Sequence, residues 1–98
     1  MTQPTLEQQA KQASEFLRTL GNEHRLLVLC LLIEHGEMNV GQILAHTTLS
    51  QSALSQHLAK MRDEGLISYR RESQTLYYTL CDEKVARVIL TLKEIFCP

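Results

Sequence analysis

Residues 49–66 read LSQSALSQHLAKMRDEGL, and they carry the signals of a helix start, an amphipathic helix and a helix end. Ser50 suits the N-cap position because its hydroxyl can accept a hydrogen bond from a free backbone N–H, and Leu49 can pack on Leu54 as a hydrophobic staple. Gly65 suits the left-handed conformation that commonly follows a last helical turn. The sequence therefore predicts a helix that begins after Ser50 and ends before Gly65.

This predicted helix has one apolar face and one polar face. Leu54, Leu58 and Met61 recur at helical spacing and are expected in the core. Short hydroxyl and amide side chains on the other face can bond base edges in the major groove, and a lysine can contact phosphate. A solvated helix without DNA contacts would show the same pattern, so this face alone leaves both interpretations open. The cap and the polar face comprise Ser50, Gln51, Ser52, Ser55, Gln56 and Lys60.

A β-hairpin is predicted directly after the helix. Residues 66–72 and 75–80 are rich in β-branched and aromatic side chains, and the short polar turn Ser73-Gln74 separates them. A hairpin in this position is typical of the wing of a winged helix-turn-helix domain, which contacts DNA beside the recognition helix. The wing residues expected to contact DNA are Arg70, Arg71 and Gln74.

The segment before residue 49 supplies the other helix of the motif. Asn39 can cap a short helix from Val40 to about Thr47, and Gln42 stands at the third helical position, as in a capping box. The turn at residues 48–50 would join this helix to the next. We therefore predict a mainly α fold with a β-hairpin wing: four helices, two strands and a fifth helix, in a winged helix-turn-helix.

Length and composition favour one small domain that spans residues 1–98. A hydrophobic content of 44% is ordinary for a globular unit, and 98 residues are too few for two domains. The N-terminus shows no basic region followed by an apolar core, so no secretion signal is expected. The longest apolar run, residues 26–33, is too short to span a bilayer. We expect a cytoplasmic protein.

The charge is unevenly distributed along the chain. The formal net charge of −1 divides into −2 over residues 1–49 and +1 over residues 50–98. So small an excess cannot give strong non-specific affinity for DNA, and binding must depend on specific contacts and on dimerisation. The basic residues near the predicted recognition helix and wing are Lys60, Arg62, Arg70 and Arg71.

Both ends of the chain are predicted to form amphipathic helices, at about residues 5–20 and 83–97, with Asp82 as a candidate cap for the second. A winged helix needs only three helices and a hairpin for its core, although the terminal helices could also pack within one chain. We predict that they form a symmetric homodimer, because two-fold symmetry matches a palindromic operator. The predicted interface residues are Leu6, Ala10, Ala13, Leu17, Val85, Val88, Ile89, Leu92, Ile95 and Phe96.

On three of its motifs the chain resembles the ArsR/SmtB family of bacterial repressors over nearly its whole length. These motifs are residues 20–26 (LGNEHRL), residues 49–58 (LSQSALSQHL) and residues 63–67 (DEGLI). The resemblance implies five helices with a hairpin before the last one, and operator DNA as the partner. It also implies a structural ion pair for Arg25 and a packing or backbone contact for His57.

The ligand sets of the family's metal sensors are missing from this sequence. Those sensors carry a cysteine pair in the helix before the recognition helix, or Asp and His ligands along the last helix. Here residues 39–46 contain no cysteine and residues 85–97 contain no histidine. Cys81 or His46 alone cannot build a tetrahedral site. We therefore predict no metal site and no cofactor.

Two cysteines form the remaining candidate site. Cys30 lies among leucines in the second predicted helix, and Cys97 follows Phe96 near the chain end. The pair resembles the dithiol of the persulfide- and redox-sensing branch of the family (BigR-, SqrR- and HlyU-like repressors). That resemblance implies that both thiols lie in one protomer and become joined by a disulfide or polysulfide bridge, which lowers operator affinity. The inducer would be a reactive sulfur species or an oxidant.

Other interpretations of the cysteines stay open. Cys30 could be a small core residue and Cys97 an unreactive terminal thiol, because apolar surroundings make a thiol less reactive. The repressor could instead respond to a metal ion or have no thiol switch. Cys81 does not fit the two-cysteine pattern and is expected to be a bystander. Three cysteines in a small intracellular protein are expected as thiols rather than as a disulfide framework.

An enzyme is not expected. No cysteine has a histidine at a plausible local spacing, and neither an acidic pair nor a glycine-rich phosphate loop occurs. A dimerisation adaptor without DNA binding would need neither the polar helix face nor the arginine-bearing wing. The histidines recur every eleven residues in dissimilar surroundings, and we assign no role to this spacing: His24, His35, His46 and His57.

Overall fold

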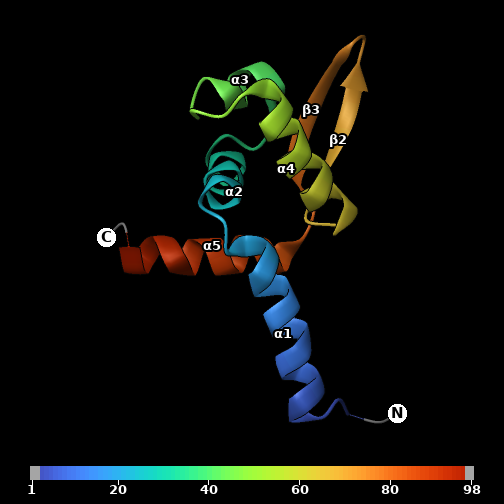
Figure 1. The fold of residues 1–98 in the computed structure, drawn as a ribbon, viewed down its shortest axis with the longest axis vertical. Helices are drawn as coiled ribbons and strands as arrows, with labels where there is room; N and C mark the ends of the chain where they lie inside the picture. The colour runs from blue at the N-terminus through green and yellow to red at the C-terminus, as the bar shows by residue number, and fades with distance from the viewer. Residues whose placement is uncertain (1–2, 97–98) are drawn as a thin grey trace.

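The computed structural model describes residues 3–96 as five helices and three short strands (Figure 1). It confirms the predicted order of elements and adds one strand before the third helix. No helix within the described residues is long and apolar enough to cross a bilayer. The elements are α1 (Leu6–Leu20), α2 (Glu23–His35), β1 (Met38–Asn39), α3 (Val40–Leu44), α4 (Gln51–Asp63), β2 (Ile67–Glu72), β3 (Thr75–Leu80) and α5 (Glu83–Phe96).

The sheet is antiparallel with the strand order β1-β3-β2. The hairpin of β2 and β3 is confirmed, and Ser73 in its turn has a φ of 57°, a left-handed conformation that is common in two-residue hairpin turns. The sequence analysis missed β1, whose residues Met38 and Asn39 pair with Tyr78 and Tyr77. Asn39 also caps α3, so a helix-start signal concealed a strand of only two residues.

The ends of α4 are those that the sequence predicts. The Ser50 hydroxyl accepts a hydrogen bond from the Ala53 N–H at 3.1 Å. At the other end Gly65 has a φ of +77° and donates its N–H to the Arg62 carbonyl, while Leu66 donates to the Met61 carbonyl. This pair of bonds is a Schellman motif, in which glycine avoids the steric cost of a left-handed residue.

The third helix begins as predicted but ends earlier. Asn39 and Gln42 form both bonds of a capping box, at 2.8 and 2.9 Å. The helix stops at Leu44 rather than at about Thr47. The N–H of the cap residue Ala45 still bonds four residues back, to Gly41, but the next two N–H groups bond three residues back: His46 to Ile43, and Thr47 to Leu44. The connection to α4 is therefore longer than the sequence predicts.

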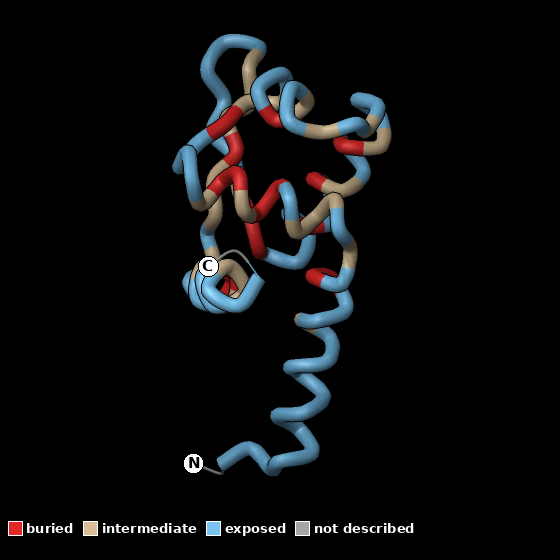
Figure 2. Tube along the Cα trace, turned by 90° about the vertical axis from the view of Figure 1, so that its left-hand side faces the viewer, coloured by how far each residue is buried: buried red, intermediate tan, exposed pale blue. Residues whose placement is uncertain are grey.

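The core lies between α2, α3, α4, α5 and the sheet, where Figure 2 shows the buried positions gathered. The predicted core residues of α4 are confirmed in it. Val85 and Ile89 are also fully buried in this core, at 0% and 1% exposure. Their prediction as dimer contacts is corrected, because side chains enclosed by their own protomer present no surface to a partner. Fully buried members are Val28, Leu29, Leu32, Ile43, Leu54, Leu58, Met61, Ile67, Val85 and Ile89.

Helix α1 projects from this core (Figures 1 and 2). Residues 6–15 are all exposed, and only Thr19 and Leu20 in the last turn are buried. A capping box between Thr5 and Gln8 closes the first turn. The helix is therefore well formed locally, but its apolar stripe is uncovered within the protomer.

Candidate nucleic-acid interface

The polar face of α4 is free of contacts with the core. Each of its predicted DNA-contacting residues is exposed, while the apolar side chains on the opposite face have at most 1% exposure. Lys60 forms an ion pair with Glu64 at 3.1 Å, which compensates part of its charge. The exposed set therefore acts mainly through neutral hydrogen-bonding groups: Ser50, Gln51, Ser52, Ser55 and Gln56.

The wing projects beside α4 and carries two different arginines. Arg71 is exposed and forms no ion pair with any residue from 3 to 96. Arg70 is engaged by two carboxylates: it donates to both oxygens of Glu37 at 2.8 and 2.9 Å and to Glu72 at 2.8 Å. Gln74, at the tip of the turn, is exposed. Arg71 and Gln74 are therefore available for DNA contacts, whereas Arg70 already has partners.

One aromatic ring of the wing, that of Tyr69, contacts α4. The Arg62 guanidinium near the end of α4 lies 5.1 Å from the centre of the Tyr69 ring on β2, a cation–π distance. Tyr69 also packs edge-on against Tyr78 at 5.6 Å. The sequence analysis considered Arg62 only as a positive charge and did not identify Tyr69, although an aromatic residue at an alternating strand position was visible.

A polar junction connects α2 with α4 and corrects two expectations. Arg25 forms no ion pair within residues 3–96; its Nε donates to His57 Nδ1 at 3.1 Å, and Nη1 donates to the Thr19 carbonyl at 3.4 Å. His57 therefore has a side-chain partner rather than only packing or backbone contacts. The nearby carboxylate of Glu64 accepts a hydrogen bond from the Thr19 hydroxyl and pairs with Lys60.

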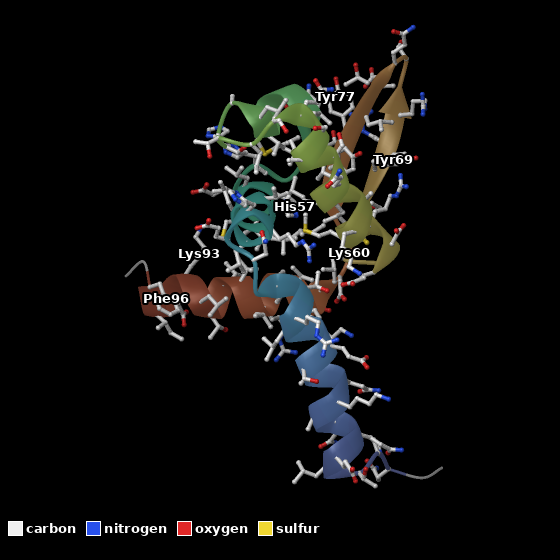
Figure 3. The ribbon with its side chains drawn as sticks, in the orientation of Figure 1. His57, Lys60, Tyr69, Tyr77, Lys93 and Phe96 are labelled. Atoms are coloured by element: carbon white, nitrogen blue, oxygen red, sulfur yellow. The ribbon has the colours of Figure 1, made fainter. Side chains whose placement is uncertain are left out.

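Two pKa values are lowered at this junction, those of Glu64 and His57. The hydrogen bond from Thr19 is the main cause that lowers the pKa of Glu64. Burial lowers the pKa of His57, and the charges of Arg25 and His24 lower it further. The centres of the His24 and His57 rings lie 5.8 Å apart. Figure 3 shows His57 between α2 and α4. A neutral His57 is consistent with its Nδ1 acting as an acceptor.

The candidate sensing cysteines are only partly described. Cys30 lies on α2 and is half-buried against the core. Cys97, the other member of the predicted pair, lies outside the described residues. Cys81 is exposed just after β3, and its thiol donates to the Gly65 carbonyl at 3.2 Å. Among residues 3–96, no three His, Cys, Asp or Glu side chains gather as metal ligands would.

An open groove lies between α1 and α5. Its volume is about 600 Å³, its floor is apolar, and Lys84 and Arg87 stand at its side. Several large apolar side chains of the two helices are exposed near the ends of the groove or beyond it. They are Leu6 at 81%, Leu17 at 57%, Ile95 at 63% and Phe96 at 73% exposure.

Comparisons with known proteins agree with this geometry. Residues 22–69 match the family model described as bacterial regulatory protein, arsR family. The HTH-type transcriptional regulator YgaV of Escherichia coli K12 is 43% identical over 93 residues, which cover 95% of this chain and 94% of YgaV.

Solved structures give the same result over the whole fold. Reduced HlyU from Vibrio cholerae superimposes with a TM-score of 0.88 at 41% identity, covering 95% of this chain and 97% of that one. The transcriptional repressor BigR from Xylella fastidiosa gives 0.83 at 34% identity, covering 94% and 90%. The expected winged helix-turn-helix is thus confirmed, and the relatives are DNA-binding regulators rather than enzymes. This chain belongs to the arsR family of bacterial regulatory proteins and is a winged helix-turn-helix regulator of transcription.

Proposed function

We propose that the protein is a dimeric cytoplasmic repressor that binds a palindromic operator through α4 and the wing, and that leaves it when Cys30 and Cys97 become linked. One observation carries the DNA-binding part: the polar face of α4 is exposed along its length, while its apolar face is buried. Hydroxyl and amide groups so displayed can bond base edges. The proposed contacts are Ser50, Gln51, Ser52, Ser55, Gln56, Lys60, Arg71 and Gln74.

Substitutions on α4 and the wing test this assignment. Gln56→Ala should relax base preference and cost about 1–3 kcal/mol of discrimination, whereas Arg71→Ala should weaken binding to all sequences similarly. A mobility-shift assay with operator and scrambled duplexes measures both. A variant with alanine at Ser52, Ser55 and Gln56 that keeps wild-type operator affinity would refute the assignment.

The exposed apolar side chains of α1 and α5 support the dimer. Leu6 and Phe96 leave 81% and 73% of their surface in water, which is costly unless another surface covers it. A two-fold axis through these helices would present two α4 helices to half-sites about one DNA turn apart. Sedimentation measures the association, and Leu17→Glu, described below, tests the surface.

The proposed switch uses ordinary thiol chemistry. The Cys30 thiolate attacks the outer sulfur of a persulfide donor. This sulfur passes to Cys30, which becomes a persulfide, and the rest of the donor leaves as a thiol. The Cys97 thiol then attacks the inner sulfur, closes a disulfide and releases hydrosulfide. With an oxidant, the two electrons and two protons of the thiols pass to that oxidant instead.

Two observations support a switch at Cys30. Lys93 of α5 lies 3.9 Å from Glu34, which is one turn after Cys30 on α2, so α5 runs beside this part of α2 (Figure 3). Lys93 is also one helical turn before Cys97 in the sequence. In addition, one related structure is of reduced HlyU, so a redox state is distinguished in that relative.

Single serine substitutions test the switch. Cys30→Ser and Cys97→Ser should bind operator but not release it on treatment with glutathione persulfide or peroxide, because one thiol cannot close the bridge. Cys81→Ser is the matched control and should respond as wild type. Mass spectrometry of each variant identifies the linked residues. Release that persists in both serine variants would show that the wrong cysteines were chosen, and release by zinc alone would favour a metal-responsive repressor.

A further inference from the structure

Arg70 of β2 forms an ion-pair cluster with Glu72 of the same strand and with Glu37, which lies just before β1. Arg70 on β2 is the register partner of Tyr77 on β3, and Tyr77 is in turn the partner of Asn39 on β1. The Arg70 guanidinium lies 4.5 Å from the centre of the Tyr77 ring and reaches past it to Glu37, the residue just before β1. Arg70 therefore bridges the two outer strands across the central one.

The contact between Arg70 and Glu37 has the geometry of a strong ion pair. Two parallel N–H···O bonds of 2.9 and 2.8 Å join the guanidinium to both carboxylate oxygens, which fixes the orientation of each group. The hydrogen bond from Arg70 is the main cause that lowers the pKa of Glu37. With Glu72 also bound at 2.8 Å, the cluster contains two carboxylates and one guanidinium and has a net negative charge. Such a cluster does not attract phosphate.

The alternation of side chains along β2 separates Arg70 from Arg71. Tyr69 and Arg71 share one face of the strand, and Tyr69 on that face contacts Arg62 of α4. Arg70 lies on the opposite face. On that face the Thr79 hydroxyl also donates to the Gly36 carbonyl at 2.9 Å, so two strands of the sheet hold the same turn at Gly36 and Glu37.

We propose that Arg70 is a positioning residue and not a phosphate contact. Its ion pair with Glu37, here called the clasp, holds β2 against the turn before β1 and so fixes the wing relative to α3 and α4. This inference rests on the proposed role of the wing in binding DNA. It replaces the expectation that both wing arginines contact DNA and leaves Arg71 as the wing's cation for phosphate. Because Glu37 immediately precedes β1 and α3 begins straight after β1, the clasp acts at the start of the helix-turn-helix.

Glu37→Gln separates the two roles by the sign of its effect. If Arg70 positions the wing, the substitution lowers operator affinity by about twofold to fivefold for each wing, which corresponds to the free energy that an exposed ion pair contributes. It also reduces the ratio of the affinity for operator to the affinity for a scrambled duplex. If Arg70 contacts phosphate, the loss of a competing carboxylate frees it and raises affinity for both duplexes. Glu72→Gln removes the same charge but leaves the bond to Glu37, so it should keep the wild-type preference.

A measurement without DNA keeps the two proposals distinguishable. Hydrogen exchange of the free protein should show faster exchange of hairpin amides in Glu37→Gln and Arg70→Ala, but not in Glu72→Gln, with α4 unchanged in all three. Wild-type exchange together with wild-type operator preference in Glu37→Gln would overturn the clasp. If the wild-type protein does not distinguish operator from scrambled DNA, the proposed function fails, while the exchange rates still decide whether the clasp holds the wing.

Discussion

Helices α1 and α4 are similar in length and both have capped N-termini, but they obtain their stability differently. In α4 the apolar face is buried against the protomer core, whereas α1 exposes every residue from 6 to 15. An isolated helix of about 12–15 residues is only marginally stable in water. The comparison indicates that α4 is stabilised by contacts within the protomer, whereas residues 6–15 of α1 have no such cover there.

The largest expected difference concerns core truncation. Leu58→Ala removes a side chain with 1% exposure from α4 and should lower the free energy of unfolding by about 2–5 kcal/mol at any protein concentration. Leu6→Ala is the matched control in α1, where the side chain is 81% exposed. Its effect should be smaller and should depend on concentration. Urea unfolding at two protein concentrations measures both, and equal, concentration-independent losses would contradict the comparison.

A charge on the apolar stripe of α1 should have the next largest effect. Leu17→Glu would place a carboxylate where we expect a partner's apolar surface, so each protomer loses about 1.5–3 kcal/mol of burial and the dimer dissociates. Sedimentation should then show a monomer that retains the helical content of the core. Lys11→Glu adds a carboxylate elsewhere on α1 and should leave the dimer intact. A dimer that survives Leu17→Glu would place the interface on another surface.

Helix caps give a smaller contrast. Asn22 Oδ1 accepts hydrogen bonds from the N–H groups of His24 and Arg25 at 2.9 and 3.1 Å and starts α2, which is central to the core. Asn22→Ala should cost about 1 kcal/mol of global stability. Thr5→Ala removes the cap of an uncovered first turn and should speed local hydrogen exchange in α1 without changing the urea midpoint measurably. The reverse order of effects would show that α1 belongs to the cooperative core.

The smallest expected effect is a pH dependence at the junction of α2 and α4. Burial and the charges of Arg25 and His24 hold the pKa of His57 below 6.5, so the unfolded chain takes up this proton at a higher pH than the folded chain. The stabilisation is therefore present above about pH 6.5 and lost as the pH falls through the lower folded-state pKa. His57→Gln should flatten the fall in urea midpoint on acidification, and Arg25→Met should reduce it. Identical pH profiles would contradict the role of the junction.

The features predicted correctly from the sequence depend on neighbouring residues. The cap at Ser50, the glycine turn at Gly65 and the hairpin turn at Ser73 each involve groups only a few residues apart, so the sequence contains the whole signal. The contacts that were missed join distant residues. Arg25 and His57 are 32 positions apart, and Arg70 and Glu37 are 33 apart, so only the packed fold brings them together.

The apolar stripe of α5 shows a second reason why helical spacing alone does not predict every contact. Spacing correctly grouped Val85 and Ile89 on an apolar face, but it could not tell whether that face meets the same chain or another. In the fold, α5 packs on α2 and β3, and both side chains belong to the core of their own protomer. The polar face of α4 was identified from helical spacing and residue type, because both signals lie within the helix itself and need no distant contact.

The independence of that polar face has an evolutionary consequence. Substitutions at Gln51, Ser52, Ser55 or Gln56 require no repacking of the core, since none of these side chains takes part in it. Under the proposed function, two copies that arise by gene duplication can therefore diverge in operator sequence through a few codon changes while they keep the same folding stability. If the proposed dimer forms through the terminal helices, copies that keep these helices alike can also exchange subunits, and a mixed dimer would recognise an asymmetric site made of one half from each operator.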